Sequence, residues 1–339
     1  MARRRWCPTI LGLVFGFGLV CSAAAQTAWP CKLPSGVNAG KVGRSTDTVA
    51  TPSGGLVLMG GGSDVDNAIR WMIERAGGGD VVVIRASGAD GYNSYIYDMG
   101  GVSSVQTLVI NSTREGDDAC VAEHIRRAEM LFIAGGDQGD YERYWKGRAV
   151  GNAINYLINT KKAPVGGTSA GMAILGQYYH PGGAPSDSSV LQDPTAVTVN
   201  TGFVEAPLLT GVVTDTHFSQ RGRQPRWVAF MASAIYNRSA GWQNLRGIAC
   251  DEATAYAVEP NGAGRVFGSH SCFFAKPTGT PEVLQPRTPL TWNLGRQALS
   301  VYRVPGTSTG ANTFNLGSYS GTGGAQQTWW VERGVLTRQ

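Results

Sequence analysis

Residues 163–175 read Ala-Pro-Val-Gly-Gly-Thr-Ser-Ala-Gly-Met-Ala-Ile-Leu, and this stretch decides the fold. A short apolar run ends at Val165, small residues follow, and a helix-compatible run comes next. The G-x-S-x-G pattern at 167–171 therefore has the strand–turn–helix context of a nucleophile elbow. A plain glycine-rich loop is the alternative, but the context favours catalysis. We predict that Ser169 is a nucleophile and that the amide of Ala170 faces a developing oxyanion.

Upstream of this stretch, short apolar runs alternate with amphipathic ones. The apolar runs have no polar alternation, which is typical of parallel strands covered on both faces; they lie at 55–59, 81–84, 108–110 and 130–134. Helical periodicity separates several of them, at 65–73, 117–128 and 147–159, and we expect Ser63 to cap the first helix. The pattern predicts an α/β fold with a doubly wound, mostly parallel sheet flanked by helices.

Composition divides the chain into a signal peptide (1–25), an irregular N-terminal arm (26–52), a catalytic domain (53–280) and a β-rich C-terminal extension (281–339). Three arginines open the first segment, an apolar run follows, and Ala23-Ala24-Ala25 offers a cleavage site. A membrane anchor is the alternative, but the apolar run is short for one. We expect export with cleavage, and hence a secreted or periplasmic protein.

The net charge of the chain after that cleavage is small. Loss of residues 1–25 removes three arginines and leaves 26 basic against 24 acidic residues, or +2. Such a charge argues for neither a nucleic acid nor a membrane surface as partner.

Four of the six cysteines lie outside the predicted signal peptide, and an even number in an oxidising compartment favours two disulfides. Residues 248–257 and 265–274 read as two strands joined by a turn containing Pro260-Asn261-Gly262. Folding this hairpin brings Cys250 close to Cys272 and leaves Cys31 to pair with Cys120. There is no C-x-x-C pair, so we expect no metal site.

A serine nucleophile needs a base, and the chain offers four histidines. His217 follows the apolar run 211–213, and the loops after strands are where active sites of open α/β sheets gather. His124 lies in an arginine-rich helical stretch and reads as a solvated surface residue. His180 lies in a Tyr-Tyr-His-Pro-Gly loop and reads as structural.

Four motifs in this chain resemble those of the cyanophycinase and peptidase E family of serine peptidases, which has a class I glutamine amidotransferase-like fold. In order, they are Ala134-Gly135-Gly136-Asp137-Gln138, Gly167-Thr168-Ser169-Ala170-Gly171, Asp215-x-His217-Phe218-x-x-Arg221-x-Arg223-x-x-Arg226 and Asp251-Glu252-x-Thr254-Ala255. They lie in family order within roughly residues 55–275, and cyanophycinases are the most similar branch. Thr216 and Met172 depart from the usual glutamine and alanine.

The resemblance implies a catalytic triad of Ser169, His217 and Glu252, in which the glutamate orients the imidazole. It also implies an oxyanion hole formed by the amides of Gly136 and Ala170. Substrate-binding roles would fall to Gln138, Asp215, Arg221, Arg223 and Arg226, since guanidinium groups bind carboxylates in a planar, bidentate way. An arginine turn with no role in binding is the alternative, and Asp215 serves equally well as its organiser.

The implied activity is hydrolysis of cyanophycin, an aspartate polymer with arginine on each β-carboxyl, to β-Asp-Arg dipeptides. Three alternatives stay open: an isoaspartyl or α-aspartyl dipeptidase of the same family, a binding protein that keeps the fold without catalysis, and an α/β-hydrolase esterase. The esterase would use Ser169, Asp251 and His270 in that chain order. We expect a peptide or cyanophycin substrate, no cofactor, and no membrane contact after signal cleavage; a homodimer stays open.

Overall fold

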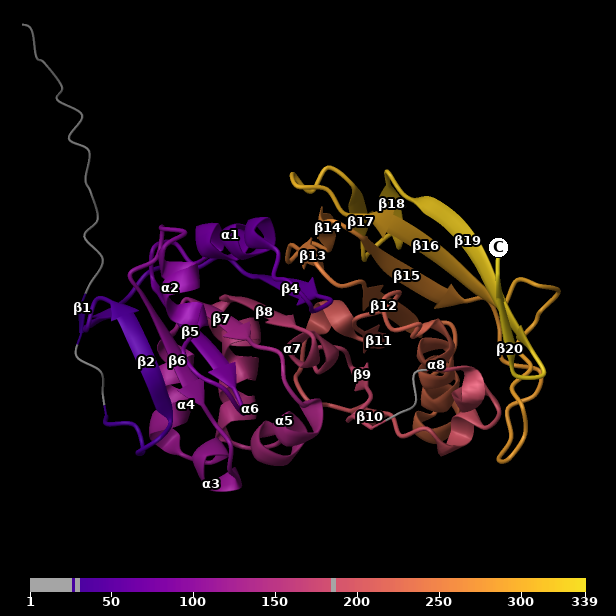
Figure 1. Ribbon diagram of the computed structural model, residues 1–339, viewed down its shortest axis with the longest axis horizontal. Helices are drawn as coiled ribbons and strands as arrows, with labels where there is room; N and C mark the ends of the chain where they lie inside the picture. Colours follow the sequence, from indigo (N-terminus) through magenta and orange to yellow (C-terminus); the bar gives the residue numbers. More distant parts are fainter. Residues whose placement is uncertain (1–25, 28–30, 184–186) are drawn as a thin grey trace, which may run out of the picture.

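Two large β-sheets organise the structure, a computed structural model that describes residues 26–27, 31–183 and 187–339. The larger sheet has the spatial order β18 (Ser320–Thr322), β17 (Thr313–Asn315), β14 (Ala263–Gly268), β13 (Thr254–Val258), β4 (Gly55–Met59), β8 (Pro164–Thr168), β7 (Met130–Ile133), β5 (Asp80–Arg85), β6 (Ser104–Val109) and β2 (Asn38–Gly43). The smaller sheet has the order β10 (Asn200–Thr201), β9 (Tyr178–Tyr179), β11 (Val212–Asp215), β12 (Arg246–Cys250), β15 (Ser271–Pro277), β16 (Leu299–Pro305), β19 (Ala325–Glu332) and β20 (Val335–Arg338). In Figure 1 the smaller sheet continues the molecule beyond β13 and β14, along its long axis.

The centre of the larger sheet is parallel: β4, β8, β7, β5 and β6 pair side by side in that order. These strands are buried almost throughout, which agrees with their continuously apolar sequences. The predicted α/β fold with a mostly parallel sheet and a β-rich C-terminal region is therefore confirmed. The C-terminal strands extend both sheets, because β17 pairs with β14 whereas β16 pairs with β15.

Helices accompany the parallel strands, as the alternating pattern predicts. They are α1 (Asp66–Arg75), α2 (Tyr92–Tyr97), α3 (Thr113–Gly116), α4 (Ala119–Arg127), α5 (Gln138–Trp145), α6 (Ala149–Tyr156) with a π-helical turn at Leu157–Lys161, α7 (Ala170–Ala173) and α8 (Gln224–Arg238). The predicted cap of α1 was wrong: its N-cap is Val65, which has no side-chain cap, and Ser63 lies outside the helix. In Figure 1, α8 packs beside the smaller sheet, whereas α1 to α6 surround the larger one.

The segment 26–52 is more ordered than its composition predicts. Residues Asn38–Gly43 form β2, which pairs antiparallel with β6 at the edge of the larger sheet, and β1 (Gln26–Thr27) pairs with β3 (Asp47–Thr48). The prediction of an irregular arm was therefore wrong for these residues. An edge strand has one neighbour and one open side, so it does not need the apolar run by which buried strands are recognised.

A β-ribbon passes from one sheet to the other. β12 and β13 run in sequence and are separated by Asp251–Ala253, and their partners β15 and β14 are separated by Ser269 and His270. β12 pairs with β15 in the smaller sheet, whereas β13 pairs with β14 in the larger one. The predicted hairpin is thus present, and it is broken where it passes from one sheet to the other.

Both predicted disulfides are present. Cys250 and Cys272 are directly opposite each other on β12 and β15, with Cα atoms 4.1 Å apart, and Cys31 is joined to Cys120 at the start of α4. The first disulfide closes the ribbon on the smaller-sheet side, immediately before the break.

The two disulfides allow a matched stability experiment. Replacing Cys250 and Cys272 together by alanine should cost about 3.4 kcal/mol of unfolding free energy, and replacing Cys31 and Cys120 about 4.6 kcal/mol, because the second pair closes the longer loop. Denaturant unfolding without reductant measures both. Only the first variant should also lose turnover while folded, since Cys250 adjoins the ribbon break that contains Glu252. Equal turnover of the two folded variants would contradict this coupling.

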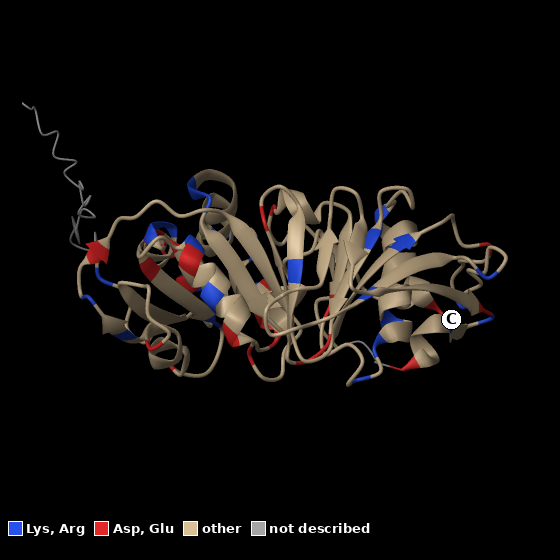
Figure 2. Ribbon diagram, turned by 90° about the horizontal axis from the view of Figure 1, so that it is seen from above, with Lys and Arg blue, Asp and Glu red and all other residues tan. Residues whose placement is uncertain are grey.

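Charge and hydropathy of the described residues add two observations. Within these residues no helix is both long and apolar enough to span a membrane. Basic and acidic residues both occur at either end of the molecule in Figure 2, where blue and red segments alternate along the ribbon.

Candidate active site

Three side chains from different parts of the fold meet where the two sheets adjoin. Ser169 directly follows β8 of the larger sheet, His217 lies two residues beyond β11 of the smaller sheet, and Glu252 lies in the ribbon break. Ser169 Oγ is 2.7 Å from His217 Nε2, and His217 Nδ1 is 2.6 Å from Glu252 Oε1. The arrangement is a continuous hydrogen-bonded chain from hydroxyl to imidazole to carboxylate, which is the geometry of a serine-peptidase triad.

The backbone at this site is strained. Ser169 has φ 53° and ψ −116°, and His217 and Ala253 have φ 47° and 50°, values that non-glycine residues rarely adopt. Backbone hydrogen bonds stabilise the turns: Ser169 N–H donates to Met59 O at 3.0 Å, and His217 N–H donates to Gly60 O at 2.8 Å. Such strain persists where surrounding structure determines the conformation, and it clusters at functional sites.

The glycines that follow β4 pack against His217 and Glu252. The sequence patterns did not predict this contact. A Cβ atom on Gly61 (φ +99°) would lie 2.4 Å from His217 Cε1, and one on Gly62 would lie 2.9 Å from the Cβ of Glu252. A Cβ on Gly60 would collide with the backbone of Asp251. The run Gly60-Gly61-Gly62 after an apolar strand was a signal of close approach that sequence alone did not connect to the histidine.

Burial, and to a smaller extent nearby charges, set the pKa of His217. Burial lowers the pKa of His217 below its ordinary value; the hydrogen bond to Glu252 opposes this, and the charges of Arg221 and Arg223 lower it further. The hydrogen bond to His217 holds the pKa of Glu252 below its ordinary value, with a further contribution from Arg221. A neutral imidazole beside an ionised glutamate is the state that a general base requires.

The exposed Arg221 provides a test of this electrostatic arrangement. Its Nε lies 3.6 Å from Glu252 Oε1, and its side chain is 51% exposed. Replacing Arg221 by glutamine removes a positive charge that disfavours the imidazolium, so the pKa of His217 should rise. Because the neutral imidazole is the active form, the acid limb of the pH–rate profile should move to higher pH.

A neutral fluorophosphonate that labels Ser169 measures this limb without involving a charged substrate. Arg221→Lys keeps the charge and should leave the limb near its wild-type position. Added salt should reduce the difference between the variants, because an exposed charge is screened. A limb that moves to lower pH in Arg221→Gln would contradict the assignment.

Asp215 and Arg226, both predicted to bind substrate, are instead buried against each other. Asp215 is 2% exposed and Arg226 6% exposed. The guanidinium of Arg226 donates to both carboxylate oxygens of Asp215, from Nε to Oδ2 at 2.8 Å and from Nη2 to Oδ1 at 2.5 Å. This is a correction: burial and a bidentate pair leave neither group facing substrate, and both support the turn that presents His217.

The other predicted substrate-binding groups lie closer to the surface. Arg221 is exposed, and Arg223 is partly buried, donating from Nη1 to Thr216 O at 2.9 Å. Burial is the main cause that lowers the pKa of Arg223, to about 10. Gln138 opens α5 and donates to His180 O at 3.3 Å.

The loop that contains Gly135 and Gly136 lies against Ser169. A Cβ on Gly135 would lie 3.3 Å from the Cβ of Ser169, whereas one on Gly136 would meet the hydroxyl of Tyr141 at 2.6 Å. Ala170 is the first residue of α7, directly after Ser169. Of the two predicted oxyanion donors, Ala170 is therefore adjacent to the serine in the chain, whereas Gly136 follows the glycine that contacts it.

The remaining histidines are placed differently. His124 is 5% exposed and shares a hydrogen bond with Gln106, so its prediction as a solvated residue was wrong. His180 stacks on Phe230 at 4.9 Å between ring centroids and bonds Thr198 O through Nδ1. His270 is exposed in the ribbon break, and Asp251 accepts hydrogen bonds from the amides of Ser219 and Ser271. The geometry thus favours His217 over the esterase arrangement.

Within the described residues, one group of side chains places its possible metal-ligand atoms within 4.8 Å of one another: Cys31, Cys120 and His124. The two sulfur atoms are bonded to each other, so they offer no thiolate to a metal.

Comparisons with known proteins show what the chain is similar to. No protein-family model matches the chain. The cyanophycinases of Synechococcus elongatus and Thermosynechococcus vestitus are each 28% identical to it over 235 residues, which cover 66% of this chain and 68% of the relative. The cyanophycinase of Trichormus variabilis is 25% identical over 191 residues, covering 56% and 59%. This similarity to cyanophycinases supports the cyanophycinase and peptidase E family that the four motifs indicate. The same similarity supports the predicted peptidase activity, and a serine nucleophile is consistent with this family.

Two solved peptidase structures show a more distant similarity. A peptidase from an acI-B1 actinobacterium is 15% identical, with a TM-score of 0.47, and the match covers 66% of this chain and 90% of that one. A putative peptidase E protein from Listeria monocytogenes EGD-e is 14% identical, with a TM-score of 0.37, covering 63% and 98%.

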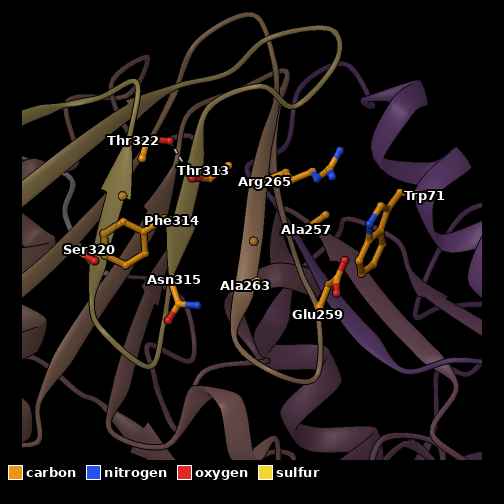
Figure 3. A pocket seen from close by; sticks show the side chains of 12 residues that line it. Trp71, Ala257, Glu259, Ala263, Arg265, Thr313, Phe314, Asn315, Ser320 and Thr322 are labelled. Atoms are coloured by element: carbon orange, nitrogen blue, oxygen red, sulfur yellow. Dashed lines mark hydrogen bonds between the residues drawn. The ribbon is translucent and has the colours of Figure 1, made fainter.

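A cavity of about 410 Å³ lies on the outer strands of the larger sheet, apart from these family motifs. Figure 3 shows it between Trp71 of α1 and the polar side chains of β14, β17 and β18. Glu259 at its rim is paired with Arg75, which also lies over the Trp71 ring. No predicted site residue lines this cavity, which is therefore separate from the candidate active site.

Proposed function

We propose that this protein is an exported serine exopeptidase that hydrolyses cyanophycin to β-Asp-Arg dipeptides through a triad of Ser169, His217 and Glu252. The observation that supports it most is the hydrogen-bonded chain from Ser169 Oγ through the His217 ring to Glu252 Oε1. Two disulfides agree with export, since such bonds persist in oxidising compartments.

The chemical steps follow from the roles of these atoms. His217 Nε2 takes the proton of Ser169 as the hydroxyl oxygen attacks the scissile carbonyl carbon, and Glu252 stabilises the imidazolium that forms. The amides of Ala170 and Gly136 stabilise the oxyanion. His217 then donates its proton to the leaving amine, which leaves an acyl-enzyme on Ser169. In the second half of the reaction His217 takes a proton from water as the water oxygen attacks the acyl carbon, and it returns that proton to the oxygen of Ser169 as the acid product leaves.

Substrate binding is assigned to the groups that remain accessible. Cyanophycin carries a free α-carboxylate on each arginine branch, and guanidinium groups bind carboxylates well. Arg221 and Arg223 fit this role, and the buried Nε of Arg223 has no hydrogen-bond partner within the described chain. Gln138 completes the proposed set, whereas Asp215 and Arg226 support the turn.

Parallel assays of the mature protein test the proposal. The substrates are cyanophycin, an isoaspartyl dipeptide, an α-aspartyl dipeptide and a short-chain ester, with Ser169→Ala protein as the blank. We expect cyanophycin to have the highest kcat/KM and to release β-Asp-Arg. Preference for a dipeptide would indicate the dipeptidase alternative, and turnover of the ester alone would indicate an esterase.

A further inference from the structure

A second cavity, of about 430 Å³, lies at the edge of the larger sheet where the nucleophile is found. Its lining residues come from the loops after β4 and β5 and from α2: Asp64, Asp66, Arg85, Gly91, Tyr92 and Tyr95. In the sheet, β4 is the neighbour of β8, whose last residue, Thr168, precedes Ser169. Ligand-binding groups of open parallel sheets gather at this carboxyl edge, so the cavity is placed to receive part of the substrate.

Asp64 connects the cavity to the nucleophile. The hydroxyls of Tyr92 and Thr168 both interact with its carboxylate, and burial raises its pKa. Thr168 is only 5% exposed. Within the described residues, Asp64 Oδ1 and Thr168 Oγ1 are both buried without a hydrogen bond of normal geometry. A half-buried carboxylate that two neighbouring hydroxyls satisfy only in part keeps acceptor capacity that a cationic ligand could use.

The other charged groups of the cavity have partners of their own. Asp66 accepts a hydrogen bond from the hydroxyl of Tyr95 at 2.6 Å. Arg85 donates from Nε and Nη1 to the carbonyls of Ser87 and Ala89, which draws its guanidinium toward that loop. Two carboxylates against one guanidinium leave the lining net negative. The rings of Tyr92 and Tyr95, with centroids 6.2 Å apart, add aromatic surface on which a cation can stack.

We propose that this cavity is a cation-accepting subsite and that Asp64 is a specificity-determining residue that binds the guanidinium of an arginine next to the scissile bond. The proposal rests on the proposed function, since it requires a substrate whose scissile bond lies at Ser169 and whose arginine side chain extends into the cavity. Asp64 does not cap α1, which begins two residues later with Val65 as its N-cap, so its carboxylate has no structural role at that helix.

Binding measurements on a protein that cannot turn over separate this proposal from the catalytic one. In a Ser169→Ala background, calorimetry compares β-aspartyl-arginine with β-aspartyl-citrulline, whose side chain has nearly the same shape but no charge. We expect arginine to bind about ten- to a hundredfold more tightly, as one charge-assisted hydrogen bond to a buried partner allows. Asp64→Asn should bring this ratio close to one.

Asp98→Asn is the matched control, because Asp98 is an exposed aspartate at the end of α2, outside the cavity lining. It should keep the wild-type ratio. The melting temperature of Asp64→Asn should not fall at neutral pH, because a carboxylate whose pKa is raised by burial destabilises the fold when ionised.

The outcomes are distinct. Two results overturn the subsite: an arginine-to-citrulline affinity ratio that Asp64→Asn leaves unchanged, or equal affinities for the two dipeptides in the Ser169→Ala protein that carries Asp64. The proposed function is overturned, and the subsite stays supported, if the wild-type protein binds the two dipeptides with different affinities but cleaves no peptide.

Discussion

Ser169→Ala protein is expected to fold normally and to lose at least about a thousandfold in turnover. Ser169 is half-buried, and loss of its hydroxyl removes the nucleophile without opening a large cavity. Removal of any triad member typically leaves only the residual catalysis of binding and the oxyanion hole. Turnover of cyanophycin by the purified variant measures the effect, with near-ultraviolet circular dichroism to establish folding. A folded variant with near-normal turnover would refute the nucleophile.

The histidines provide a matched pair for the same experiment. His217→Ala should be as damaging as Ser169→Ala, because His217 Nε2 is the atom within hydrogen-bond distance of the serine hydroxyl. His270→Ala should have little effect, since His270 is exposed in the ribbon break. The reverse order of effects would favour the esterase arrangement with Asp251.

Gly61→Ala is expected to lower turnover by about a hundredfold or more, although the change adds one methyl group. That methyl would lie 2.4 Å from His217 Cε1, so the imidazole must move away from Ser169. Misplacement of a catalytic group by about 1 Å can cost a hundredfold in rate. The rate of Ser169 labelling by a neutral fluorophosphonate reports the loss independently of substrate binding.

Gly78→Ala is the control that separates this clash from backbone strain. Gly78 has φ +85°, close to the +99° of Gly61, but its added Cβ would meet nothing within 4 Å. Both variants should lose about 1 kcal/mol of stability through the left-handed conformation. Only Gly61→Ala should lose activity. Equal turnover of the two variants would show that the imidazole tolerates the methyl group.

Local sequence patterns were sufficient for the parallel core and for selecting Ser169 and His217 as candidate nucleophile and base, whereas Glu252 was suggested only by the family resemblance. The run at 55–59 and the other three apolar runs have no polar alternation, because helices cover both faces of their sheet. A strand that is buried on both faces can therefore be recognised from its own residues. The elbow at 167–171 is likewise local, since the sharp turn needs small residues next to the serine. The pairing of Cys250 with Cys272 followed from one hairpin register.

Features that depend on contacts between distant segments were not predictable in this way. Asp215 and Arg226 are eleven residues apart, and only the packing of α8 against β11 shows that they bury each other instead of facing substrate. His124 was misread because an arginine-rich helix can still bury one face. The approach of Gly61 to His217 joins residues far apart in the chain, so no spacing rule could reveal it.

The β-ribbon that passes from the smaller sheet to the larger has a consequence for when the protein becomes active during its synthesis. Ser169 lies in the first half of the chain, whereas His217 and Glu252 are made later, and β13 reaches its place beside β4 only after Glu252 has been added. An incomplete chain therefore has a serine without a base, which is a weak nucleophile. Proteolytic capacity is thus expected to arise late, once the ribbon has closed, and partly made chains would be unable to digest one another or their neighbours.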